Sequence, residues 1–204
     1  MQFKKTEIED ALVRAAREEF LAKGFNDASI RTITQNAGVA RSNLYNYFAN
    51  KDALFTAVVH PTIVEIRQGI KFVWDIMICN EECIPSLEKE MTEGWIMVEF
   101  IDIHREDLAL ILLKSAGSSV EQFREELQEE YQKMHSWYFN YVKAQFPDRM
   151  KNTVSPFFIH ALSAWMLHFV TEVISHGIPR DEMLGYMEEC VLFYYYGQLG
   201  ILEH

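Results

Sequence analysis

The chain has 204 residues, 49% of them hydrophobic, so it is long and apolar enough to bury a sizeable core. Its net charge of −11 argues against nucleic-acid binding over the whole surface. Residues 1–60, however, contain eight Lys/Arg and seven Asp/Glu, a net of +1, whereas the other 144 residues contain 11 and 23, a net of −12. This asymmetry indicates that the two parts of the chain have different roles.

Helical periodicity begins near the N-terminus, and strand patterns are almost absent from the chain. Five apolar residues share one face of the first predicted helix: Ile8, Leu12, Ala15, Ala16 and Phe20. We expect Gly24 to end this helix, because glycine is common at helix C-termini.

Two short helices follow. Ser29 is a good N-cap for a second helix over about 30–37, which Gly38 stops. A third is expected over about 41–47, and Asn50 can cap a fourth. A helix, a tight glycine turn and another helix form the helix-turn-helix arrangement, although many helical hairpins share this pattern.

Longer helices are predicted for the rest of the chain. Pro85, Pro147, Pro179 and a Gly-Ser-Ser stretch separate them. The predicted helices cover residues 51–79, 86–103, 106–115, 119–145, 154–176 and 181–199. Pro61 lies inside the first of them and predicts a kink. The chain is therefore expected to be all-α, with about nine helices.

Several short motifs follow one another in the N-terminal part. They are Gly24-Phe25, Ser29-Ile30-Arg31, Ala37-Gly38-Val39, Leu44-Tyr45, Tyr47-Phe48 and Asn50-Lys51-Asp52-Ala53-Leu54. In this order they strongly resemble the N-terminal domain of the TetR family of transcriptional regulators, over about residues 7–57. The rest of the chain resembles the family only in the number and length of its helices. The resemblance implies a three-helix DNA-binding domain at 1–50 and a larger ligand-binding and dimerisation domain at 51–201.

Two positions depart from the pattern of that family. Thr34 stands where the family often has alanine, and Ala40 where it often has a small polar residue. Ala40 removes one possible cap or phosphate contact at the start of the third helix. Neither departure conflicts with the fold.

The resemblance implies that the third helix enters the major groove of DNA. Leu44 and Phe48 are expected to point inward, while Arg41, Asn43 and Asn46 carry most of the sequence preference. Other polar residues position the protein on phosphates. The full expected set of DNA-contacting residues is Ser29, Arg31, Arg41, Ser42, Asn43, Tyr45, Asn46, Tyr47 and Lys51.

The predicted helix at 154–176 is apolar almost all round. With Glu172 as the single formal charge in 153–176, it approaches the length of a membrane span, but polar residues interrupt it and burial by protein is the favoured interpretation. One side can pack on its own domain and the other needs a partner. We expect a homodimer through the helices near 154–176 and 181–199, which predicts a near-palindromic operator in double-stranded DNA.

The resemblance also implies a small-molecule site on the middle helices of the C-terminal part. The candidate residues are mostly aromatic, which favours an apolar or aromatic ligand. They are Met91, Trp95, Phe100, His104, Trp137, Tyr141, Trp165 and His168. A ligand that prefers a different spacing of the two recognition helices would release the dimer from DNA. Pro61 and Gly69 are the candidate bending points.

The three cysteines, Cys79, Cys83 and Cys190, do not form a disulfide framework, which favours a reducing cytoplasm. The N-terminus lacks the apolar stretch of a secretory signal. The last residues, 202–204, resemble the start of a purification tag and are set aside. The expected protein is a cytoplasmic, ligand-responsive regulator, most simply a repressor.

Two alternatives remain open. Cys79 and Cys83 are four apart and, together with His104, could bind a metal or sense oxidants. Alternatively, the chain is a helical binding protein or enzyme that retains a vestigial DNA-binding head. Enzyme motifs such as a phosphate-binding glycine loop or a nucleophile elbow are missing, so no catalytic residue, cofactor or metal site is predicted.

Overall fold

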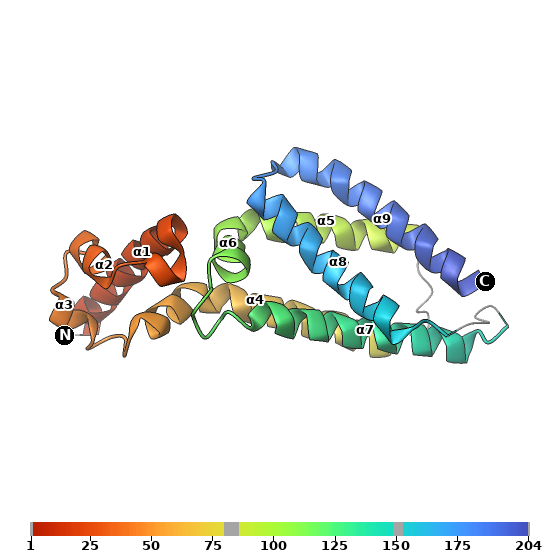
Figure 1. The fold of residues 1–204 in the computed structure, drawn as a ribbon, viewed down its shortest axis with the longest axis horizontal. Helices are drawn as coiled ribbons and strands as arrows, with labels where there is room; N and C mark the ends of the chain where they lie inside the picture. Colours follow the sequence, from red (N-terminus) through yellow and green to blue (C-terminus); the bar gives the residue numbers. More distant parts are fainter. Residues whose placement is uncertain (1, 80–85, 149–152, 204) are drawn as a thin grey trace. The chain divides into compact units, whose positions relative to one another are not determined.

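The protein is described by a computed structural model covering residues 2–79, 86–148 and 153–203 (Figure 1). Its helices are α1 (Gln2–Asp27), α2 (Ile30–Asn36), α3 (Arg41–Leu44), α4 (Lys51–Cys79), α5 (Leu87–Ile103), α6 (Arg105–Leu113), α7 (Phe123–Gln145), α8 (Pro156–Ser175) and α9 (Arg180–Glu203). The described residues contain nine helices and no strand, which confirms the prediction of an all-α fold.

The chain forms two compact units. The head unit comprises Met1–Arg67 and Glu106–Arg124, and the body unit comprises Gln68–Arg105 and Glu125–His204. The head unit therefore contains α6 and the first part of α4 in addition to the N-terminal helices. The boundary between the two domains predicted from the sequence lies at residue 50. The remainder of α4 belongs to the body unit.

Local signals shape the N-terminal helices as predicted. Gly24 has a φ of 73° and interrupts α1 with non-helical geometry. Ser29 caps α2, with its Oγ accepting a hydrogen bond from Thr32 N, and Asn50 Oδ1 accepts one from Ala53 N at 2.7 Å. Gly38, with a φ of 67°, makes the turn after α2.

The third helix is shorter than expected. α3 ends at Leu44, and the chain continues in turns in which Asn46 N donates to Asn43 O and Tyr47 N to Leu44 O. These tighter hydrogen bonds, spanning three residues, replace the α-helical ones over the last predicted turn.

The core of the head unit is aromatic. Phe20, Phe25 and Phe55 are buried, and the ring centroid of Phe20 lies 4.9 Å from that of Phe55 in an edge-to-face arrangement. Two hydrogen bonds join the segment after α6 to the end of α1: Lys114 Nζ donates to Leu21 O at 2.6 Å, and Phe25 N donates to Lys114 O at 2.8 Å. α6 is thus tied to the end of α1.

One buried ion pair crosses the head unit. Arg17 on α1 pairs with the carboxylate of Asp107 on α6. Thr62 Oγ1 on α4 donates to the other oxygen of Asp107 at 2.7 Å. Three helices therefore share one buried carboxylate whose charge is matched.

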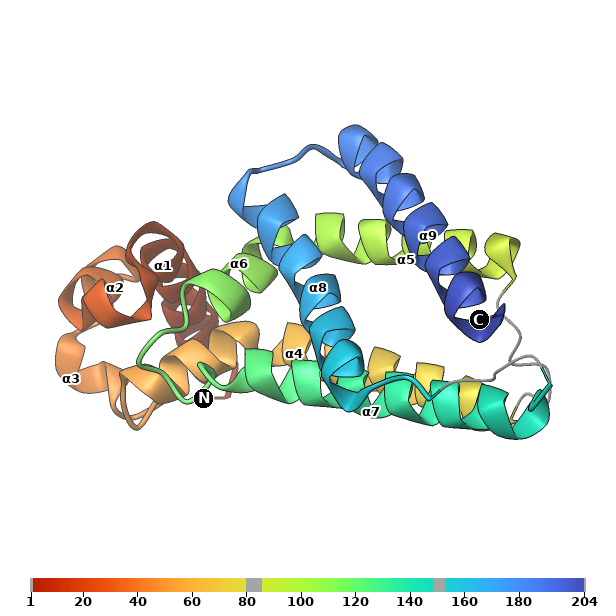
Figure 2. The same ribbon diagram turned by 45° about the vertical axis from the view of Figure 1, so that its right-hand side comes forward.

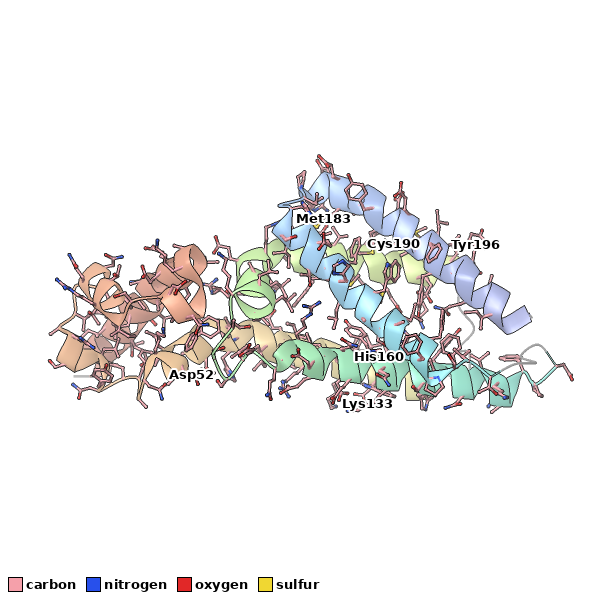
Figure 3. All side chains as sticks on the ribbon, in the orientation of Figure 1. Asp52, Lys133, His160, Met183, Cys190 and Tyr196 are labelled. Atoms are coloured by element: carbon pink, nitrogen blue, oxygen red, sulfur yellow. The ribbon has the colours of Figure 1, made fainter. Side chains whose placement is uncertain are left out.

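In the body unit, α5 packs closely on α9, and α7 lies against α8 (Figures 1 and 2). A Cβ on Gly94 of α5 would meet Met187 Cγ of α9 at 2.9 Å, so glycine permits the close approach. Phe139 and Val142 of α7 form a buried cluster with Ile159 of α8. Figure 3 shows His160 at the end of α8 that approaches α7, where its ring lies within hydrogen-bonding distance of two glutamines.

Helix α8 is the described helix that is long and apolar enough to cross a membrane, with a mean hydropathy of 1.5 and 33% of its most apolar window buried. Two of its large side chains, Phe157 and Phe158, are 80% and 41% exposed. Burial by the same chain is therefore incomplete, and an apolar face remains uncovered.

Candidate DNA-binding and ligand-binding sites

The segment from α3 to the start of α4 presents one polar face and one apolar face. Leu44 is fully buried and Phe48 almost so, which confirms that these two residues point inward. Arg41, Ser42, Tyr45 and Asn46 are exposed, and Asn43 and Tyr47 are half-buried. The predicted base-contacting residues thus lie on a solvent-facing surface, held by an apolar anchor.

The side-chain amides of Asn43 and Asn46 are hydrogen-bonded to each other. Asn46 Nδ2 donates to Asn43 Oδ1 at 2.9 Å. This bond fixes both amide planes and leaves the Asn43 amide group and the Asn46 oxygen available as a donor and an acceptor. Adenine offers the complementary pair of groups in the major groove.

The residues expected at phosphates have different surroundings. Arg31 is exposed, and Ser29 has its hydroxyl engaged in the cap of α2. Lys51 Nζ donates to Asn26 O at 3.0 Å and Ala28 O at 3.3 Å, and lies 4.7 Å from the Phe25 ring centroid. Lys51 therefore holds the turn before α2, a role that its sequence context does not indicate.

All eight predicted ligand residues lie in the body unit, where they are distributed over separate contacts. Phe100 and His104 form one ring pair, with centroids 4.5 Å apart, and Trp137 stacks on Tyr141 at 5.0 Å. The ring centroid of Trp165 lies 6.0 Å from that of Phe193. Met91 is half-buried, and the side chains of Trp95 and His168 are exposed.

A second set of body-unit residues was not predicted. His135 Nδ1 on α7 lies 3.0 Å from Ser163 Oγ on α8. Because the Ser163 hydroxyl donates its proton to Ile159 O at 2.9 Å, its oxygen is an acceptor for a protonated Nδ1 of His135. Burial lowers the pKa of His135 to about 4, partly offset by its bond to the backbone of Tyr131, so the ring is neutral near pH 7.

Two acidic residues belong to the same set. Burial raises the pKa of Glu90 to about 7, helped by the nearby Glu93 and opposed by Lys89. Burial also raises the pKa of Glu93. The pKa of Tyr194 on α9 is raised by burial first and then by the charges of Glu90, Tyr138 and Glu93.

A periodic signal could have identified Glu90 from the sequence. It precedes Gly94 by four residues and Val98 by eight, and both are buried residues of α5. A carboxylate on the buried stripe of an amphipathic helix is an exception that calls for a partner.

The cysteine hypothesis lies partly outside the described residues. The placement of Cys83 and of the Cys79 side chain is not described, and Cys190 is a half-buried free cysteine. Among the described residues, no three His, Cys, Asp or Glu side chains are grouped so as to hold a metal ion. Metal or redox sensing through Cys79 and Cys83 stays a hypothesis.

Comparison with known proteins places the geometry in context. The family model described as "Bacterial regulatory proteins, tetR family" matches residues 12–58. The regulator YdgC of Bacillus subtilis is 36% identical over 68 residues, 33% of this chain and 35% of YdgC. The Escherichia coli K12 regulator UidR is 32% identical over 97 residues, 44% of this chain and 47% of UidR. The matches thus span about a third to a half of these two relatives.

Solved structures extend the likeness to almost the whole chain. NalD of Pseudomonas aeruginosa, described as the secondary repressor of the MexAB-OprM multidrug efflux pump, superposes with a TM-score of 0.65 at 17% identity, covering 93% of this chain and 95% of NalD. The Bacillus subtilis regulator FadR, in complex with stearoyl-CoA, gives 0.60 at 14% identity, covering 90% and 95%. At such identities these likenesses establish the fold.

The fold and the α2–α3 surface define an all-helical protein with an N-terminal helix-turn-helix. Residues 12–58 are thus similar to the N-terminal domain of bacterial regulatory proteins of the tetR family, and the chain as a whole has the fold of solved TetR-like regulators.

Proposed function

We propose that this protein is a homodimeric, sequence-specific DNA-binding regulator that represses transcription and is released from its operator by a small molecule. The observation that carries the proposal is the two-sided α3 segment. Leu44 and Phe48 anchor it in the core, while Arg41 and the coupled amides of Asn43 and Asn46 face solvent. In this proposal residues 1–50 bind DNA, residues 51–201 bind the ligand and the second copy, and the protein acts in the cytoplasm.

The direct test is selection of bound duplexes from a random DNA pool with the purified protein, repeated between about 50 and 200 mM KCl. We expect a near-palindromic site whose half-sites lie about one DNA turn apart. Arg41→Ala should weaken binding to that site by roughly tenfold or more, because one bidentate base contact contributes about 1–3 kcal/mol.

Lys71→Ala is the matched control, since it removes an exposed positive charge from the body unit. Failure to enrich any sequence, or equal losses in the two variants, would contradict sequence-specific recognition. The second outcome would leave only non-specific attraction to the phosphate backbone.

The dimer is supported by uncovered aromatic side chains on the last two helices. Phe157, Phe193 and Tyr196 are 80%, 74% and 60% exposed, and Figure 3 labels Tyr196 on α9. An exposed apolar surface of this kind is typical of an interface. A two-fold dimer through α8 and α9 would bury it in both copies.

Light scattering on the eluting protein tests the dimer. Phe193→Glu should convert it to a monomer, because each interface would bury two unpaired carboxylates. Phe72→Glu is the control, since Phe72 is 65% exposed but lies on α4. A wild-type monomer, or dissociation in both variants alike, would contradict an interface through α8 and α9.

Ligand response is supported by the fold and by the body unit's half-buried aromatic residues. The stearoyl-CoA bound to FadR shows that a protein of this fold accepts a small molecule. For this chain we propose a ligand with an aromatic or apolar part, contacting residues of the predicted set such as Trp137 and Tyr141. Binding would favour a state with a different spacing of the recognition helices.

Bending within α4 is the proposed coupling step. α4 stays helical through Pro61, and Gly69 is exposed. Pro61→Ala should change the effect of inducer on operator affinity, because it restores a backbone donor and removes the ring that favours bending. Identical operator affinities for variant and wild type, with and without inducer, would exclude Pro61 as the bending point.

A further inference from the structure

Two hydrogen bonds join Asn43 and Asn46, one between their side chains and one between their backbones. Asn46 Nδ2 donates to Asn43 Oδ1 at 2.9 Å, and Asn46 N donates to Asn43 O at 3.1 Å. The same segment is anchored from below by Leu44 and Phe48, which are 0% and 6% exposed. The two amides are therefore arranged relative to each other before any DNA is bound.

The bond between the two amides determines which of their groups remain for a base. A side-chain amide has an amino group that donates and an oxygen that accepts. Because the bond uses an N–H of Asn46 and the oxygen of Asn43, the unused groups are the amino group of Asn43 and the oxygen of Asn46. If both amides turn over, the bond runs from Asn43 to Asn46, and one amino group and one oxygen again remain. In either arrangement the pair presents a donor and an acceptor.

Adenine is the base whose major-groove edge matches such a pair. It presents an acceptor, N7, beside a donor, the N6 amino group. Guanine presents two acceptors, cytosine presents a donor, and thymine presents an acceptor and a methyl group. Arg41 carries donors only and therefore suits guanine rather than adenine. The amide pair and Arg41 thus complement different bases.

We propose that Asn43 and Asn46 act as a single reader of adenine, so that each operator half-site contains an adenine contacted through N7 and the N6 amino group by this pair. The inference rests on the proposed DNA binding and specifies one base of the operator. Asn46 is exposed and Asn43 is half-buried, so the pair is accessible from solvent. Since the amides are already held together, less side-chain freedom is lost on binding than with two independent amides.

The first test changes the DNA and leaves the protein intact. In the selected operator, 7-deazaadenine replaces one adenine at a time, symmetrically in both half-sites; it pairs with thymine but lacks the N7 acceptor. Affinity is measured by fluorescence anisotropy at one salt concentration. We expect one position at which the wild-type protein binds roughly tenfold or more weakly, because a base contact is lost. Asn43→Ala should bind the two DNAs alike, because it has already lost that contact.

The second test changes the base preference. Asn43→Asp keeps an oxygen that accepts from Asn46 Nδ2 and replaces the amino group of Asn43 with a second oxygen. Both unused groups of the pair are then acceptors, so the preferred base at this position should change from adenine to cytosine, whose N4 amino group donates.

Asn36→Asp is the matched control, because Asn36 is an exposed asparagine at the end of α2 in the same head unit. It introduces the same negative charge. We expect it to weaken binding to all operator variants by a similar factor, because the charge acts on the phosphate backbone, and to leave adenine as the preferred base.

The third test asks whether the two amides act as one reader. Asn43→Ala and Asn46→Ala should each remove most of the preference for adenine, because each leaves the other amide without its partner. The double variant should lose little more than either single one. Such non-additivity is expected of two residues in one hydrogen-bonded unit.

Three results would overturn the adenine reader: 7-deazaadenine is tolerated at every position, Asn43→Asp keeps the base preference of the wild type, or the losses of Asn43→Ala and Asn46→Ala add. Each of them presupposes a selected operator, so sequence-specific DNA binding would stand without this reader. If the selection enriches no sequence at all, the proposed regulatory function fails and the reader fails with it.

Discussion

The head and body units treat a buried carboxylate in opposite ways. In the head unit Asp107 receives the guanidinium of Arg17 and the hydroxyl of Thr62, so its charge is matched within the fold. In the body unit Glu90 has no such partner among the described residues, and its pKa is raised. A matched buried carboxylate stabilises the fold, whereas an unmatched one lowers stability unless it is protonated or gains a positive partner.

The largest expected effect comes from removing the partner of Asp107. Arg17→Met should lower the free energy of unfolding by about 2–3 kcal/mol, below the range for a fully buried pair because the Arg17 side chain is 33% exposed. Urea denaturation measures the change. Arg14→Met, on the exposed face of α1, is the control and should cost less than about 0.5 kcal/mol. Equal costs would mean that Asp107 is adequately solvated without its partner.

In the body unit the corresponding change should have the opposite sign. Glu90→Gln should raise the free energy of unfolding by about 2 kcal/mol near pH 8, because it removes a charge that the fold disfavours. Thermal melts of the ligand-free variant, with Glu129→Gln as control, measure it. A destabilised Glu90→Gln variant would show that the carboxylate has a favourable partner and would remove the contrast between the units.

The pH dependence of stability follows from the same residue. The pKa of Glu90 is about 7 in the folded protein and 4.5 as a reference value, so between these values the folded state binds more protons than the unfolded state. The contribution of Glu90 to stability therefore falls as pH rises from about 5 to about 7 and is level above that. Glu93 adds to the upward shift and Lys89 opposes it. Melting wild type and Glu90→Gln over this range should show their difference growing with pH, and a constant difference would contradict the raised pKa.

A smaller effect is expected at the second partner of Asp107. Thr62→Val keeps the shape of the side chain and removes the hydroxyl that donates at 2.7 Å, which should cost about 1.5 kcal/mol. In a double-mutant cycle with Arg17→Met the two losses should not add, because both act on one carboxylate. Strict additivity, measured by urea denaturation, would mean that Arg17 and Thr62 stabilise the head unit separately.

These contrasts also explain which features could be predicted from the sequence. Gly24, Ser29 and Asn50 act on neighbouring residues, and the structure has each where the local pattern predicts it. The partners of Asp107 are 90 and 45 residues distant in the chain, so no local pattern identifies them. Glu90 raises the pKa of Tyr194 because α5 packs on α9, and that packing depends on the whole body unit.

Among the predicted site residues, too, those that depend on local spacing were easier to predict than those that depend on packing between distant helices. Leu44 and Phe48 were predicted as buried from their spacing of four residues together with the family resemblance, and the remaining face of α3 was then expected to be exposed. The ligand residues were predicted from their aromatic character, and this signal does not distinguish core packing from ligand contact. His135 was missed because it is unremarkable until a helix from elsewhere in the chain covers it, whereas Glu90 was missed although its spacing from Gly94 and Val98 places it on the buried side of α5.

The smallest effect tests whether the ammonium group of Lys51 serves only the fold of the head unit or also contacts a DNA phosphate. Lys51→Met retains the apolar stem over Phe25 and removes the hydrogen bonds to Asn26 O and Ala28 O, so it should cost about 1 kcal/mol of stability. If Nζ also reaches a phosphate, the slope of log affinity against log salt for the selected operator should decrease in magnitude by about 0.9. We expect both changes, because an ammonium group has three donors and the fold uses two of them. A loss of stability with an unchanged salt slope would make Lys51 purely structural, and the head unit would then contact phosphates only through residues such as Arg31, whose side chain is exposed.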